Sequence, residues 1–345
     1  MSFGVVVDEA FLEHRNPPGH AERPERIQAL LEIVGRLPRS VVRIPPYLID
    51  ENQILAVHSR EHLERIAATA EREETMLDPD TYTNACSFEA ARLAAGSAVR
   101  LVEAMFGFEI EAGFAMVRPP GHHATRNRAM GFCLFNNVAI AAQWAIGQGG
   151  MERVAIVDFD VHHGNGTEEL FWSRRDVLYI SSHQYPFYPG TGAAEDIGAG
   201  EGVGFTVNLP VGEGQDDAFF ASLYAEIVAP ILREYQPGLI IVSAGYDAHV
   251  RDPLGGMRMT ADGYGELAAI LSGVAREVCD GRILYVLEGG YDLQGLATSV
   301  TKSILAAVDS SDGRRVFEGT DAFAAYRREV VARLGSRWRS LAPKQ

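Results

Sequence analysis

The sequence predicts a single doubly wound α/β domain, with a central parallel sheet and helices on both faces. Short apolar runs alternate with longer segments of helical periodicity, which is the pattern of such domains. No internal repeat, low-complexity tract or Pro/Ser-rich linker divides the 345 residues. With 47% hydrophobic and 22% charged residues, the chain can fill a large core without cross-links.

Six apolar runs predict the strands of this sheet. Each is four or five residues long and is dominated by Val, Ile, Leu or Phe, as expected of buried strands. In chain order they are Gly4–Val7, Phe114–Val117, Val154–Asp158, Val177–Ser181, Leu239–Ser243 and Ile283–Leu287.

Six longer segments between these runs have helical periodicity. They are Pro24–Gly35, Phe88–Phe106, Asn136–Ile146, Asp216–Glu234, Ala261–Val278 and Leu293–Val308. Two connections, Tyr185–Gly204 and Ala248–Thr260, are rich in Gly and Pro and too long for simple turns, so we expect them to serve function. We expect one domain over residues 1–345, with a core of about residues 1–310 and a helical extension over 311–345, whose basic residues form a solvated face.

Charge, hydropathy and cysteine content exclude several classes of protein. The net charge of −15 argues against binding to a nucleic-acid backbone, which needs a basic face. No apolar run approaches the ~20 residues of a membrane span, and Met1–Gly4 lacks the start of a signal peptide. Cys86, Cys133 and Cys279 are too few and too scattered for a disulfide framework. We therefore expect a cytoplasmic protein.

The most informative segment is Asp158-Phe159-Asp160-Val161-His162-His163, which directly follows a predicted buried strand. Side chains along a strand repeat with a period of two, so Asp160 and His162 point the same way. Two carboxylates and two imidazoles at a strand end suit a divalent metal. The alternative is a polar strand end with solvated carboxylates.

Four other predicted strands also end in polar motifs. These are Arg118–His123, Ser181–His183, Ser243–Asp247 and Glu288–Tyr291. Open α/β sheets place their chemistry at the carboxyl ends of the strands, where these motifs converge. A hydrolytic metal site needs ligands, a base and an oxyanion donor. Asp160, His162 and Asp247 can ligate, His122 and His123 can handle protons, and Tyr291 can donate to an oxyanion.

The chain resembles the histone deacetylase family over nearly its whole length, from Gly19–Arg26 to Tyr291. The core motifs of the resemblance are Arg118–His123, Gly131–Asn137, Asp158–Gly166, Ser243–Gly256 and Glu288–Tyr291. That family includes bacterial deacetylase-like amidohydrolases and acetylpolyamine amidohydrolases. The resemblance implies the arginase-deacetylase α/β fold. It also implies one catalytic zinc ion, held by Asp160, His162 and Asp247.

By the same resemblance, zinc and His123 activate a water, and Tyr291 and zinc stabilise the oxyanion. His123 then protonates the leaving amine, while His122 modulates the electrostatic field at the site. Asp158 is the implied partner of His122 and Asn165 that of His123. The neutral Asn165, together with Glu288-Gly289-Gly290, resembles the class II branch.

The resemblance assigns further residues to the substrate path and to monovalent cations. Gly131, Phe132, Tyr188 and Leu254 match the substrate channel, although single apolar residues are usually plain packing, and Arg26 matches a guide for departing acetate. One or two potassium ions are implied. Asp158, Asp160, His162, Ser181 and Ser182 match the inner site, and Phe171, Arg174 and Val177 match the outer site through backbone carbonyls.

The first substrate hypothesis is acetylated lysine side chains or related acetylated amines, and acetylated polyamines are the alternative. A catalytically silent binding protein and a binuclear manganese ureohydrolase on a related fold are the remaining alternatives. Homo-oligomerisation is possible. We expect that Cys133 and four lone histidines have no catalytic role; these histidines are His20, His58, His183 and His249. We also expect that His163 is not a metal ligand.

Overall fold

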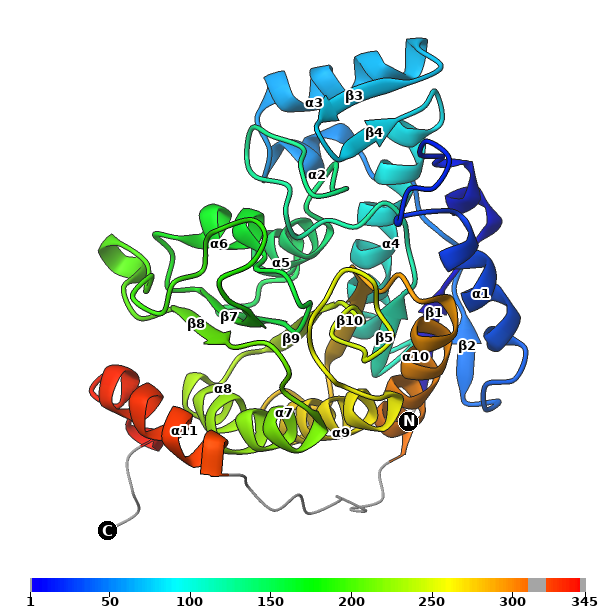
Figure 1. Ribbon diagram of the computed structural model, residues 1–345. Coiled ribbons are helices and arrows are strands. Elements are labelled where there is room, and N and C mark those ends of the chain that lie inside the picture. Colours follow the sequence, from blue (N-terminus) through cyan, green and yellow to red (C-terminus); the bar gives the residue numbers. More distant parts are fainter. Residues whose placement is uncertain (1, 310–320, 342–345) are drawn as a thin grey trace.

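The computed structural model describes residues 2–309 and 321–341. Its centre is a sheet of eight parallel strands in the order β2-β1-β5-β10-β9-β6-β7-β8 (Figure 1). The strands are β1 (Phe3–Val6), β2 (Val41–Arg43), β5 (Ala112–Ala115), β6 (Val154–Asp158), β7 (Val177–Gln184), β8 (Thr206–Val211), β9 (Leu239–Ala244) and β10 (Ile283–Leu287). A separate antiparallel pair joins β3 (Thr75–Asp78) and β4 (Thr81–Thr83).

Helices cover both faces of the sheet, which explains why every residue of the central strands is buried. One layer contains α4, α5 and α6, which pack on β5, β6 and β7 respectively. In the other layer α9 packs against α10, α8 and α7, and α1 packs against α10 (Figure 1). The helices are α1 (Glu25–Val34), α2 (Glu51–Leu55), α3 (Arg60–Ala67), α4 (Ser87–Phe106), α5 (Asn137–Gly147), α6 (Asn165–Phe171), α7 (Asp217–Leu223), α8 (Ala229–Tyr235), α9 (Ala261–Val278), α10 (Leu293–Val308) and α11 (Asp321–Leu334).

The predicted α/β class and all six predicted strands are confirmed, although β5 lies two residues earlier than predicted. Sequence reasoning missed β2 and β8 at the two edges of the sheet. The first has only three residues, and Asn208 and Pro210 interrupt the apolar run of the second. Proline is tolerated there because an edge strand leaves one row of backbone groups unpaired.

One predicted helix, Asp216–Glu234, is divided into α7, a π-helical turn over Tyr224–Val228, and α8. Pro230 lies in the first turn of α8 and has no backbone N–H to continue the regular hydrogen-bond ladder. Helices α2, α3 and α6 were not predicted. In particular, α6 begins at Asn165, two residues after the Asp158–His163 segment.

The C-terminal extension packs on the core rather than forming only a solvated face. Helix α11 lies against α7, and Trp338 is buried beside Phe205. The Arg333 guanidinium donates to the carbonyl oxygen of Asn208 at 2.9 Å. Residues 310–320 and 342–345 of the predicted extension lie outside the described residues. Within residues 2–309 and 321–341, no helix is both long and apolar enough to cross a bilayer.

Candidate active site

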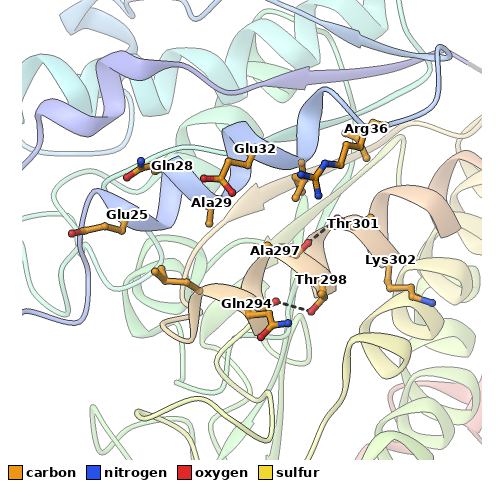
Figure 2. A pocket seen from close by; sticks show the side chains of 13 residues that line it. Glu25, Gln28, Ala29, Glu32, Arg36, Gln294, Ala297, Thr298, Thr301 and Lys302 are labelled. Atoms are coloured by element: carbon orange, nitrogen blue, oxygen red, sulfur yellow. Dashed lines mark hydrogen bonds between the residues drawn. The ribbon is translucent and has the colours of Figure 1, made fainter.

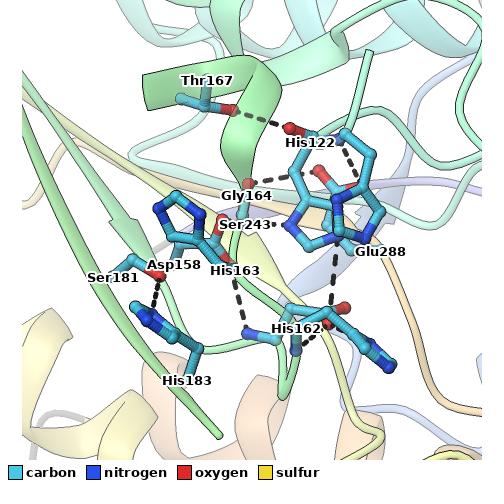
Figure 3. Close-up of polar contacts among 12 residues, drawn as sticks. His122, Asp158, His162, His163, Gly164, Thr167, Ser181, His183, Ser243 and Glu288 are labelled. Carbon is cyan, nitrogen blue, oxygen red and sulfur yellow. Dashed lines mark hydrogen bonds and ion pairs between the residues drawn. The ribbon is translucent and has the colours of Figure 1, made fainter. Parts of the chain in front are cut away.

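Five central strands deliver polar side chains to one edge of the sheet. The chain leaves β5 toward His122 and His123, β6 toward Asp160 and His162, and β9 toward Asp247. It also leaves β10 toward Glu288 and Tyr291, while Ser181 and Ser182 lie within β7. Since neighbouring parallel strands end at the same edge, these side chains come close together. Figure 3 shows His122, His162, Ser181 and Glu288 among them.

Asp160, His162 and Asp247 form a group that could hold a metal ion. One ligand atom of each lies within 4.8 Å of the others, and all three residues are buried. Nδ1 of His162 lies 3.1 Å from an oxygen of Asp160 and 3.1 Å from an oxygen of Asp247. No other group of three such ligands exists within the described part of the chain. Two carboxylates and one imidazole form a donor set that fits a divalent metal such as zinc.

The charge of this group supports the same interpretation. No arginine or lysine of residues 2–309 and 321–341 pairs with Asp160 or Asp247. In the metal-free chain the compensating proton falls on His162: burial opposes it, but hydrogen bonds to both carboxylates raise its pKa to about 10. A divalent cation could replace that proton and satisfy both buried carboxylates.

Backbone N–H groups orient the carboxylates of Asp160 and Asp247 through hydrogen bonds. The Gly289 N–H donates to Asp160 Oδ2 at 2.8 Å, and the Val161 N–H donates to Asp247 Oδ1 at 2.8 Å. Two glycines leave the necessary space, because a Cβ atom at Gly245 would collide with Asp160 and one at Gly289 with Asp247. These close approaches explain why the strand-end motifs contain glycine beside the acids.

The two adjacent imidazoles, His122 and His123, have opposite electrostatic environments although their ring centroids are only 4.0 Å apart. Nδ1 of His122 lies 3.1 Å from Asp158 Oδ2, which also accepts a hydrogen bond from the Tyr179 hydroxyl. Burial opposes protonation of His122, but Asp160 and Asp158 outweigh it and raise the pKa of His122 to about 10. His122 is therefore the cationic member of the pair in the metal-free chain.

His123 is the neutral member of the pair. Burial, with the neighbouring His122 and His162, holds the pKa of His123 well below its usual range. Its Nδ1 lies 2.8 Å from Oδ1 of Asn165, whose amide nitrogen faces the sulfur of Met130. An amide oxygen only accepts, so this contact places the proton on Nδ1 and leaves the lone pair on Nε2. Such a histidine can take up a proton at Nε2.

Tyr291 is held at the site through its backbone and its ring. Its N–H donates to Asp252 Oδ2 at 2.6 Å, which gives Asp252 a supporting role outside the metal group. The ring packs edge-on against Phe132, with centroids 5.8 Å apart. On another side, the Arg26 guanidinium lies 5.0 Å from the centre of the Tyr291 ring.

Arg26 also supports the turn that carries Tyr291. Its guanidinium donates to the carbonyl oxygens of Gly290 at 2.7 Å and Glu288 at 2.5 Å. Glu22 pairs with both Arg26 and Arg118, and all three side chains are fully buried. The structure thus places Arg26 beside the site as an anchor of the turn, a contact that sequence reasoning did not anticipate.

Sequence reasoning also missed a role for the Glu288 carboxylate. Glu288 Oε2 accepts hydrogen bonds from the Gly121 N–H at 2.6 Å and the His122 N–H at 3.1 Å (Figure 3). Burial raises the pKa of Glu288 to about 7 against the opposing effect of His122. The carboxylate therefore links β10 to the histidine-bearing segment after β5.

A cavity of about 490 Å³ leads to this group. His123, His162 and Tyr291 line it, together with all four residues predicted for a substrate channel: Gly131, Phe132, Tyr188 and Leu254. Tyr188 packs edge-on against His123, with ring centroids 5.2 Å apart. Sequence reasoning missed other lining residues, namely Asp80, Gln184, Phe187, Glu213, Pro253, Gly255 and Gly256.

The residues predicted for potassium lie in two places. Asp158 pairs in register with Ser181 across β6 and β7, so the inner-site residues share the catalytic edge of the sheet. The Ser181 hydroxyl lies 2.9 Å from Nδ1 of His183. Phe171, Arg174 and Val177 lie at the end of α6 and the start of β7, where the Arg174 N–H donates to the Phe171 carbonyl.

His163 and His183 fix the loop that carries Tyr188. Nδ1 of His163 lies 2.8 Å from the Thr191 hydroxyl, and Nε2 of His183 lies 2.9 Å from the Gly192 carbonyl oxygen. The two rings lie 4.7 Å apart (Figure 3). His20 supports the opposite wall, because its ring packs edge-on against Phe132 at 4.7 Å. His163 and His183 therefore contact the loop after Tyr188, and His20 contacts the lining residue Phe132; none of the three belongs to the metal group.

A larger groove of about 640 Å³ lies elsewhere, between α1 and α10 (Figure 2). Its lining includes Glu25, Glu32, Arg36 and Lys302 but no histidine or cysteine. It has no group of metal ligands, so size alone does not identify the site.

Comparisons with known proteins agree with this geometry. Residues 20–307 match the model of the histone deacetylase domain. A probable deacetylase of Archaeoglobus fulgidus is 39% identical over 316 residues, which cover 90% of this chain and 88% of that protein. A histone deacetylase-like amidohydrolase of Pseudomonas aeruginosa is 40% identical over 277 residues, which cover 79% of this chain and 73% of that protein.

The fold agrees as well. The crystal structure of the HDA15 HD domain matches with a TM-score of 0.92 and 37% sequence identity, covering 99% of this chain and 98% of that one. The matched family domain spans the whole candidate site, from Arg26 to Tyr291. This chain therefore belongs to the histone deacetylase family of hydrolases.

Proposed function

We propose that this protein is a zinc-dependent amidohydrolase that removes acetyl groups from acetylated amines, either acetyl-lysine side chains or acetylpolyamines. The observation that carries the proposal is the buried Asp160–His162–Asp247 group beside a neutral His123, at a cavity lined by Tyr291. Family membership supports the hydrolytic reaction.

A zinc ion held by Asp160, His162 and Asp247 would supply Lewis-acid polarisation of a carbonyl and activation of water. His123 accepts the proton of the attacking water at Nε2, because Asn165 occupies its Nδ1. It returns that proton to the nitrogen of the leaving amine.

The remaining side chains stabilise charge and exclude water. The Tyr291 hydroxyl donates to the oxygen that becomes negative when the carbonyl is attacked. His122, whose Nδ1 lies 3.1 Å from Asp158, contributes to the electrostatic field of the site. The aromatic rings of Phe132 and Tyr188 line the cavity and suit a thin alkyl chain.

We also propose two accessory roles. Potassium would bind the oxygens of Asp158, Asp160, His162, Ser181 and Ser182, and a second ion the carbonyls of Phe171, Arg174 and Val177. The register between Asp158 and Ser181 supports the inner site. Arg26, whose guanidinium lies over the Tyr291 ring, would guide acetate away from the site.

The test is a deacylation panel on acetyl-lysine peptides and acetylpolyamines, with metal content measured in parallel. Activity should follow zinc occupancy: it should fall on chelation and return on adding zinc. Undiminished turnover after verified removal of zinc would refute the proposal. Two manganese ions per chain would instead favour the ureohydrolase alternative.

A further inference from the structure

Acidic side chains line the mouth of the cavity, and Arg128, which pairs with Asp78 outside the lining, interacts electrostatically with Asp80. Apart from the catalytic histidines, the charged or ionisable side chains that line it are Asp80, Glu213 and the two tyrosines, and no lysine or arginine is among them. Asp80 belongs to the segment between β3 and β4, whereas Glu213 belongs to the turn between β8 and α7. The two carboxylates therefore reach the same opening from separate parts of the chain.

The Glu213 turn is fixed against the rim of the cavity. The Gly214 N–H donates to the Gly256 carbonyl at 2.9 Å, and the Arg258 N–H donates to the Gln215 carbonyl at 2.8 Å. The Glu213 side chain lies over Gly256, where an added Cβ atom would be only 2.7 Å from Glu213 Cγ. Glycine at 256 therefore leaves the room that this glutamate occupies.

The Glu213 carboxylate is available to a ligand. The side chain is exposed, and it has no hydrogen bond or ion pair with any residue of 2–309 or 321–341. Nearby acids differ: Asp78 pairs with Arg128 at 2.5 Å, and Asp80 accepts hydrogen bonds from Thr81 and Gly131. Glu213 is thus the acid at this opening whose charge no other side chain offsets.

We propose that Glu213, assisted by Asp80, selects substrates that carry a positive charge beyond the acetylated nitrogen, namely N-acetylated diamines and polyamines. This inference rests on the proposed amidohydrolase function and narrows its substrate class. The apolar Leu254 and the aromatic walls contact the alkyl chain, while the two carboxylates attract the ammonium group that follows it. Each carboxylate lies near water, so each contributes the modest preference of a partly screened ion pair.

The test compares three acetamides matched in chain length, with a cationic, a neutral and an anionic end: N-acetyl-1,6-diaminohexane, N-heptylacetamide and 6-acetamidohexanoate. For the zinc-loaded enzyme, kcat/KM should be about threefold to tenfold higher for the cation than for the neutral compound, and lowest for the anion. Glu213→Gln should lower the cation-to-neutral ratio about twofold to fivefold, mainly through KM. Rising salt should lower the wild-type ratio in the same direction.

Glu201→Gln is the matched control, because Glu201 is 79% exposed and lies outside the cavity lining. It should leave the ratio unchanged. An acetyl-lysine peptide, as a fourth substrate, separates failure of the charge preference from failure of the proposed amidohydrolase activity. Activity on the peptide with no preference among the three acetamides, or an unchanged ratio in Glu213→Gln, would overturn the inference alone. A zinc-loaded enzyme inactive on all four substrates would overturn the proposed function.

Discussion

The amide oxygen of Asn165 lies 2.8 Å from Nδ1 of His123, so a neutral group orients the histidine that would act as the base. The neighbouring His122 has a carboxylate, Asp158, in the equivalent place. A carboxylate favours the imidazolium, whereas an amide orients the ring with little effect on its charge. This difference separates the roles of two imidazoles that are adjacent in sequence.

We therefore expect Asn165→Asp to raise the pKa of His123. Burial is the largest of the causes that hold that pKa well below its usual range, so His123 stays deprotonated and competent as a base at neutral pH. A base with a higher pKa is lost earlier as pH falls, so the acidic limb of the kcat/KM profile should move upward by about one unit or more. An unmoved acidic limb, with metal content unchanged, would argue against His123 as the base.

Tyr291→Phe should lower kcat by about 10²–10³, the usual cost of losing one oxyanion donor. The substitution keeps the ring that contacts Phe132 and Arg26, so the cavity wall and metal content should survive. Steady-state kinetics with parallel metal analysis checks this. Tyr82→Phe is the control, because Tyr82 lies outside the cavity lining and its hydroxyl makes only a long 3.4 Å contact with Pro79. Near-normal turnover of Tyr291→Phe would show that the Tyr291 hydroxyl is not the oxyanion donor.

Gly289→Ala should weaken metal binding by about 10- to 100-fold, the range found when the support of a ligand is disturbed. The new Cβ would collide with the Asp247 carboxylate, and the Gly289 N–H is the donor that orients Asp160. Chelator competition measures the affinity directly. Gly35→Ala is the matched control, since Gly35 has no atom within 4 Å of the added Cβ. Equal affinity in both variants would mean that the carboxylates adjust freely.

The sequence predicts the metal-ligand group and its edge of the sheet because those features depend on local pattern. The strand-end position of Asp160 and His162 is readable from the sequence. Because β6 ends at Asp158, bends after the strand, rather than strand alternation, bring the two side chains together. Asp247 follows from the same rule applied to β9. Short edge strands such as β2 are missed because three residues contain too little pattern.

Other features cannot be read from the sequence because they depend on long-range packing. The contact of Arg26 with the Glu288–Tyr291 turn joins residues more than 260 positions apart. The exposed charge of Glu213 matters only because the β8–α7 turn lies over Gly256. His163 directly follows His162 of the candidate metal group, yet its ring faces Thr191. Neighbours in the sequence thus do not reveal these roles.

Glu22→Gln should lower the free energy of unfolding by about 3–5 kcal/mol, the usual cost of breaking a buried ion pair from one side. Glu22 pairs with Arg26 and Arg118 at full burial, so the amide would leave two buried guanidinium groups undercompensated. Denaturant titration measures the change. Glu13→Gln, in an exposed pair with Arg15, should change stability by less than about 1 kcal/mol.

The buried ion pairs of Glu22 also predict how the stability of the protein depends on pH. Burial alone would raise the pKa of Glu22, but Arg118 and the hydrogen bonds hold it well below its ordinary value of 4.5. A carboxyl whose folded pKa is depressed contributes its full stability above the unfolded pKa and loses it as pH falls through the folded one. The wild-type protein should therefore lose stability below about pH 4.5 more steeply than Glu22→Gln. Parallel curves for the two proteins would show that Glu22 is not the acid-sensitive group.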